Sequence, residues 1–153
     1  MPKPTDAHRK LERLLGNWRG EEKIFPTPWD PKGGTAKARA ENRGALGGFI
    51  VVQEYEQERE GTINFRGHGV FSWDPAHQCY IMTWFDTMGM PPTEFKGNFM
   101  DNILTLTNQN PQGQSEAIFD FRQEGKYSFR MEVSQDGKQW VPFMEGNYRK
   151  EGS

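Results

Sequence analysis

The sequence has very little cysteine and no long hydrophobic run. Its 153 residues include one cysteine, Cys79, which excludes an internal disulfide framework and a metal site built from several cysteines. No stretch approaches the ~20 consecutive apolar residues of a membrane-spanning helix, and the first residues contain no apolar signal region. We therefore expect a cytoplasmic protein, and the length predicts one domain over residues 1–153.

Aliphatic residues and excess charge are also scarce. Only 34% of the residues are hydrophobic, whereas 13% are aromatic, and such a core suits half-solvated antiparallel strands better than a buried parallel sheet. The formal net charge is −2, with both signs interspersed, and this gives no electrostatic footprint for nucleic acid or an anionic membrane. We expect neither as a partner.

Sequence motifs of catalysis and cofactor binding are missing. There is no glycine-rich phosphate loop at a helix start, no Gly-x-Ser-x-Gly and no histidine pair at metal-ligand spacing. The histidines are His8, His68 and His77. The sequence therefore predicts no metal site and no cofactor.

The first residues have a helical pattern. Apolar side chains spaced at i, i+4, i+7 and i+8 lie on one helix face, and here they are Ala7, Leu11, Leu14 and Leu15. Thr5 or Asp6 can cap the start, and Gly16 can end the helix in the left-handed conformation. We predict a short capping helix at about residues 5–15.

After Gly16 the hydrophobic period changes to two, and glycine, asparagine, aspartate and proline recur at turn positions. The predicted strands are Trp18–Phe25, Thr35–Arg43, Phe49–Arg59, Thr62–Trp73, Gln78–Asp86, Thr93–Met100, Asn102–Asn108, Gln114–Arg122, Lys126–Ser134 and Gln139–Tyr148. No helix-length pattern separates them, and closure would remove the two edges of an open sheet. The sequence thus predicts an all-β fold, an up-and-down antiparallel barrel of about ten strands over residues 17–149.

Loop lengths orient this barrel. The turns after the first, fifth and seventh strands are longer than most of those at the helix end, so we predict that the mouth lies opposite the helix. Trp18 is predicted to close the base beneath the helix, with Arg149 stacked on its indole. Trp29, in the first long loop, is predicted to cover the mouth or to contact a second copy.

Several motifs occur in an order shared with a known family. They are Leu14-x-Gly16-x-Trp18, Gly47-Gly48-Phe49-Ile50-Val51, Phe65-x-Gly67-x-Gly69-Val70-Phe71, Trp73-Asp74, Tyr80, Trp84-Phe85-Asp86-Thr87-Met88-Gly89, Gly97, Leu104-Thr105-Leu106 and Met144-Glu145-Gly146-Asn147-Tyr148-Arg149. In these motifs the sequence resembles the bacterial family catalogued as domain of unknown function 1579. The resemblance implies a lipocalin-like or fatty-acid-binding-type (calycin) barrel and gives no reaction.

A more distant likeness is to the nitrobindin group, ten-stranded barrels that hold haem through a histidine near the last strand. No histidine follows His77 in this chain. We therefore do not expect haem held in that manner.

Two candidate sites involve ionisable side chains. His68 lies between Gly67 and Gly69 and could serve as an acid, a base or a hydrogen-bond anchor. The alternative is an outward histidine whose glycine neighbours make room for Trp73 or another aromatic ring. Asp86, on the same strand face as Trp84, could bind a polar head group at the mouth or accept backbone hydrogen bonds from the following turn.

Aromatic and methionine side chains dominate the predicted inward face of the ninth strand, which carries Tyr127, Phe129, Met131 and Val133. Flexible methionines such as Met131 and Met144 can conform to an irregular ligand, or they can simply fill the barrel. The complete set of candidate ligand-binding residues is Tyr55, His68, Trp84, Asp86, Met88, Phe129, Met131 and Met144.

The leading functional hypothesis is a barrel that binds a small hydrophobic or amphipathic ligand in its interior without catalysis. The first alternative is a calycin-type enzyme, an isomerase or hydrolase, that uses His68 with Asp86 or Tyr55. The second is a non-catalytic interaction barrel that forms a homodimer through outward apolar side chains, for which the candidates are Ile81, Phe85, Val141 and Phe143.

Overall fold

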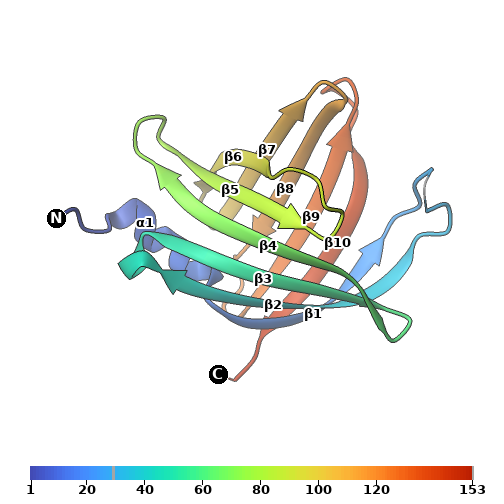
Figure 1. Ribbon diagram of the computed structural model, residues 1–153, viewed down its shortest axis with the longest axis horizontal. Helices are drawn as coiled ribbons and strands as arrows, with labels where there is room; N and C mark the ends of the chain where they lie inside the picture. Colours follow the sequence, from blue (N-terminus) through green and yellow to red (C-terminus); the bar gives the residue numbers. More distant parts are fainter. Residues whose placement is uncertain (29, 153) are drawn as a thin grey trace.

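The computed structural model describes residues 1–28 and 30–152, which form a closed barrel of ten antiparallel strands with a short helix at one end (Figure 1). The helical elements are α1 (Asp6–Lys10), η1 (Leu11–Leu14) and η2 (Leu46–Gly48). The strands are β1 (Gly16–Ile24), β2 (Gly34–Ala45), β3 (Ile50–Arg59), β4 (Thr62–Asp74), β5 (Cys79–Asp86), β6 (Thr93–Met100), β7 (Ile103–Asn110), β8 (Gly113–Asp120), β9 (Lys126–Ser134) and β10 (Val141–Lys150). The predicted all-β fold is confirmed, and every predicted strand occurs.

The strands follow one another around the barrel in chain order, and β10 pairs with β1 to close it. Because successive side chains of a strand point to opposite faces, every second residue points into the interior. On β1 the inward residues are Trp18, Gly20, Glu22 and Ile24, and the outward ones include Arg19 and Glu21. The same alternation lets a chain with few aliphatic residues build an interior from aromatic rings.

The N-terminal helical segment closes one end of the barrel. Leu14 is fully buried and Trp18 is 3% exposed, and the Trp18 indole Nε1 donates a hydrogen bond to the Leu14 carbonyl oxygen at 2.9 Å. The Tyr80 hydroxyl donates to the Ala7 carbonyl oxygen at 2.6 Å. The predicted closure by Trp18 beneath the helix is confirmed.

Two details of this end differ from the prediction. The α-helix ends at Lys10, a 3₁₀ turn follows, and Gly16, with φ +128°, begins β1 rather than ending the helix in the left-handed conformation. The cation near the Trp18 ring is Lys150, with Nζ 5.8 Å from the ring centroid, and not Arg149. The reason is register, because Lys150 is the residue of β10 paired with Trp18.

The opposite end carries the long loops. Figure 1 shows the β1–β2 loop and α1 at opposite ends of the barrel, as the loop lengths predicted. Trp29 lies outside the described residues. Among the helices of residues 1–28 and 30–152, none has the length and apolar character needed to cross a membrane.

Candidate functional site

The barrel interior holds a cavity of about 660 Å³, within the range typical of small-molecule sites. Seven of the candidate residues line it: Tyr55, Trp84, Asp86, Met88, Phe129, Met131 and Met144. Thr27 and Asp30 from the β1–β2 loop and Asn110 from the end of β7 also belong to the lining. The cavity therefore opens at the end that carries the long loops.

His68 is not part of this cavity. Its Nδ1 atom lies 2.5 Å from Glu54 Oε1, and both side chains are more than 40% exposed on the outer face. The flanking glycines serve an aromatic ring instead, because a Cβ atom on Gly67 would lie 2.2 Å from the indole of Trp84. The structure thus supports the alternative interpretation of His68 and corrects its place among the candidate ligand-binding residues.

Strands β8, β9 and β10 contribute much of the apolar part of the cavity wall, and β1, β4, β5 and β6 also contribute to it. The Phe129 ring packs on Phe119 with centroids 4.8 Å apart, and Met131 is the cross-strand partner of Met144. Phe143 sits at the register shift between Pro142 and Met144 and lines the cavity, so it is not one of the outward apolar side chains. Of the other outward candidates, Phe85 and Val141 are exposed and Ile81 is half-buried.

A polar cluster in the interior was not predicted. Glu22, only 2% exposed, accepts hydrogen bonds from three side chains, which we call with it the Glu22 cluster: Tyr55, Gln57 and Tyr148. The Tyr55 hydroxyl lies 2.6 Å from Oε2, the Tyr148 hydroxyl 2.5 Å from Oε2, and Gln57 Nε2 2.8 Å from Oε1. The Gln57 carbonyl oxygen accepts in turn from Asn64 Nδ2 at 3.1 Å, so the amide is held at both ends.

Two glycines make this arrangement possible. A Cβ atom on Gly20 would lie 2.4 Å from the Tyr148 ring, and one on Gly146 would lie 2.3 Å from the Tyr148 hydroxyl oxygen. The Tyr148 ring can therefore lie flat against β1 and β10, and this position brings its hydroxyl group within hydrogen-bond distance of Glu22. The sequence did contain a signal for the cluster, because strict alternation from Trp18 places Glu22 on the inward face of β1.

The tyrosines of this region hold their protons strongly. Burial raises the pKa of Tyr148, Tyr55 and Tyr127, and the negative charge of Glu22 raises each pKa further. Their hydroxyls therefore stay protonated, and those of Tyr55 and Tyr148 act as donors to Glu22.

These raised pKa values predict a loss of stability in alkali. The folded protein holds the tyrosine protons more tightly than the unfolded chain does. The contribution of these tyrosines to the free energy of unfolding is therefore fully present below about pH 10 and decreases as the pH rises further. Each tyrosine contributes up to about 1.4 kcal/mol per pH unit. Urea unfolding at a series of alkaline pH values measures this slope. In Tyr55→Phe the free energy of unfolding should decrease less steeply with pH. An unchanged slope in this variant would contradict the attribution of the alkaline loss of stability to Tyr55.

Asp86 and Trp84 lie at the mouth of the cavity. The Trp84 indole Nε1 donates to Asp86 Oδ2 at 2.8 Å, and the Met88 backbone N–H donates to Oδ1 at 2.9 Å. Asp86 therefore fulfils the structural role considered for it, an acceptor for the following turn, while it also lines the cavity. Within residues 1–28 and 30–152 no group of three His, Cys, Asp or Glu side chains could hold a metal ion.

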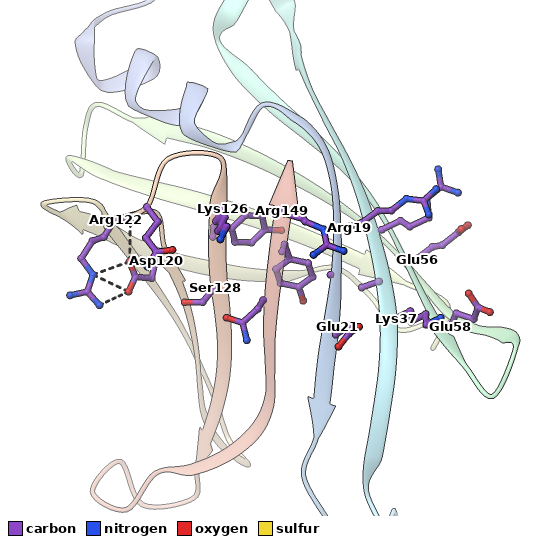
Figure 2. A pocket seen from close by; sticks show the side chains of 17 residues that line it. Arg19, Glu21, Lys37, Glu56, Glu58, Asp120, Arg122, Lys126, Ser128 and Arg149 are labelled. Atoms are coloured by element: carbon purple, nitrogen blue, oxygen red, sulfur yellow. Dashed lines mark hydrogen bonds and ion pairs between the residues drawn. The ribbon is translucent and has the colours of Figure 1, made fainter. Parts of the chain in front are cut away.

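A second concave region, a groove of about 930 Å³, lies on the outer face of the barrel over β1, β2, β3, β9 and β10 (Figure 2). Its charged side chains are Arg19, Lys37, Arg39, Arg122, Lys126 and Arg149 with Glu21, Glu56, Glu58 and Asp120. The groove is the larger of the two, but its walls carry charges of both signs, whereas ligand pockets are mostly apolar. The interior cavity is therefore the better candidate site.

One row of this groove carries four cations opposite one another on adjacent strands: Lys126, Arg149, Arg19 and Arg39. Arg19 forms an ion pair with Glu151 at 2.5 Å, while the other three form no ion pair within the described part of the chain. Like charges directly opposite in a sheet are destabilising.

Arg149→Glu should therefore stabilise the barrel, because it places a carboxylate opposite both Arg19 and Lys126. We expect a gain of about 1 kcal/mol in low salt that shrinks as salt screens the charges. Urea denaturation at two ionic strengths measures it, with Arg149→Gln as the control that removes the repulsion without adding attraction. A loss of stability at low salt would show that repulsion between Arg149 and its cationic neighbours does not destabilise the barrel.

The fold has known structural relatives. The crystal structure of Rv2717c from M. tuberculosis superposes with a TM-score of 0.70 at 11% identity, covering 97% of this chain and 99% of that one. The S-type phycobiliprotein lyase CPES from Guillardia theta superposes with a TM-score of 0.62 at 11% identity, covering 98% and 99%. At this identity the likeness concerns the fold alone.

Sequence comparison gives a family. No curated protein matches the sequence. The family model described as "Protein of unknown function (DUF1579)" matches residues 3–150, which is nearly the entire chain. The chain therefore belongs to the DUF1579 family, as its motif order predicted.

Proposed function

We propose that this protein binds a small hydrophobic or amphipathic molecule in the barrel interior. The observation that carries the proposal is the cavity of about 660 Å³ that opens at the loop end. Protein interiors are normally packed without voids of this size, so a barrel that only needed to be stable would fill its interior with side chains.

The chemistry of the wall supports the same proposal. Phe129, Met131 and Met144 offer an apolar and adaptable surface, while the Glu22 cluster and Asp86 supply a few polar groups. Pockets for small molecules usually combine these two features. The enzymatic alternative is weaker, because His68, its acid or base, lies on the outer face and cannot reach a ligand next to Tyr55 or Asp86 in the cavity.

Binding of the neutral hydrophobic fluorophore N-phenyl-1-naphthylamine tests the proposal. We expect saturable binding by the wild type and at least about tenfold weaker binding by Met131→Trp, since the larger side chain occupies the cavity. The matched control is Met100→Trp, at a methionine that is 79% exposed on β6, and it should bind as the wild type does. Absence of saturable binding, or equal binding by a folded Met131→Trp variant, would count against the interior site.

A further inference from the structure

The charge inside the cavity is unbalanced. The charged side chains in its described lining are Asp30, Arg59 and Asp86. Asp30 balances the charge of Arg59, because Arg59 Nη1 lies 2.9 Å from Asp30 Oδ2, while Nη2 donates to the Gly33 carbonyl oxygen at 2.9 Å. The described lining therefore contains no cation beyond this ion pair.

The other two negative groups, Asp86 and Glu22, have only neutral partners. Asp86 is held by the Trp84 indole and the Met88 backbone N–H. The Glu22 carboxyl group, behind the wall, is held by two hydroxyls and an amide. A carboxylate or phosphate on a ligand would enter a low-dielectric cavity beside negative charges with no cation to compensate it, which is costly.

The tyrosine hydroxyl groups of the cavity wall are oriented to accept hydrogen bonds from a ligand rather than to donate them. Tyr55 and Tyr148 line the cavity and donate their hydroxyl protons to Glu22, so toward a ligand their oxygens can act only as acceptors. The Tyr55 oxygen also accepts a hydrogen bond from Gln57 Nε2 at 3.3 Å. The amide of Gln57 is occupied by Glu22 on its nitrogen and by Asn64 on its oxygen. At the Glu22 cluster the cavity wall therefore accepts hydrogen bonds, and the rings of Trp84 and Phe129 are suited to a nearby cation.

We infer that the ligand carries a head group that donates hydrogen bonds, with an ammonium preferred over a hydroxyl and a carboxylate disfavoured. The head group lies at the Glu22 cluster, and the apolar body lies against Phe129, Met131 and Met144. This inference rests on the proposed function and specifies the chemical class of its ligand.

Displacement of N-phenyl-1-naphthylamine by dodecylamine, dodecanol and dodecanoate at neutral pH tests the inference, because these probes differ only in the head group. We expect dodecylamine to bind most tightly, dodecanol next and dodecanoate at least about tenfold more weakly than dodecylamine. In Glu22→Gln the preference for the amine should fall several-fold, whereas the matched control Glu58→Gln, on the exposed outer face of β3, should keep it.

The outcomes separate the two proposals. If the fluorophore itself does not bind, the proposed function fails. If the fluorophore binds and dodecanoate competes as well as dodecylamine, the ligand class is wrong and the interior site stands. A folded Glu22→Gln variant with the full amine preference would also overturn the inference, and if this variant does not fold, the ranking by the wild type decides.

Discussion

Replacing Trp18 by alanine is expected to lower the free energy of unfolding by about 3–5 kcal/mol. The indole is 3% exposed, packs on Tyr127 with ring centroids 4.8 Å apart, and donates a hydrogen bond to Leu14. Truncation removes the transfer free energy of the ring and leaves a cavity, and these two costs add. Since a typical domain is stable by only about 5–15 kcal/mol, the melting temperature should fall by roughly 10 °C.

Phe85→Ala is the control for this experiment. Phe85 is an aromatic residue of β5 that is 44% exposed, so its truncation should change stability by no more than about 0.5 kcal/mol. Chemical denaturation of the two variants gives both numbers. Similar small effects at both positions would show that the burial of Trp18 at the barrel base contributes little to stability.

Glu22→Ala is expected to cost about 3 kcal/mol or more, although it removes a charged group from the interior. The substitution leaves the hydroxyls of Tyr55 and Tyr148 and the amide of Gln57 without their acceptor. Each buried donor without a partner costs about 1–3 kcal/mol.

A multiple-mutant cycle shows whether the donors cause this cost. When Tyr55→Phe and Tyr148→Phe are added to Glu22→Ala, two of the three stranded donors disappear, and much of the lost stability should return. The free energies of unfolding from urea titrations should therefore be strongly non-additive. Additive losses would mean that the carboxyl group and the hydroxyls contribute independently.

The sequence was sufficient for the fold because the relevant signals are local. Turn residues and period-two alternation marked every strand, and the Gly16-Asn17-Trp18 segment located the closed end of the barrel. The α-helix was predicted too long because the spacing of Leu11 and Leu14 fits a 3₁₀ turn as well as an α-helical one.

The site was only partly predictable because it depends on which side chains meet across strands. Alternation identified Trp84, Met131 and Met144, but it could not show that the glycines beside His68 accommodate Trp84. The Glu22 cluster needed the register of β1 against β10, which brings Tyr148 opposite Gly20. Residues separated by 126 positions in the chain gave no local signal for that contact.

This separation also bears on how the chain folds. The Glu22 cluster joins β1 and β3 to β10, across the seam where the last strand meets the first. Contacts between distant parts of a chain form slowly, since the entropy of closing the long intervening loop is lost before they form. We therefore expect the hydrogen bond from Tyr148 to Glu22 to form late in folding. By the same reasoning, this hydrogen bond should mainly slow unfolding. Interactions that are absent from the folding transition state affect the unfolding rate more than the folding rate.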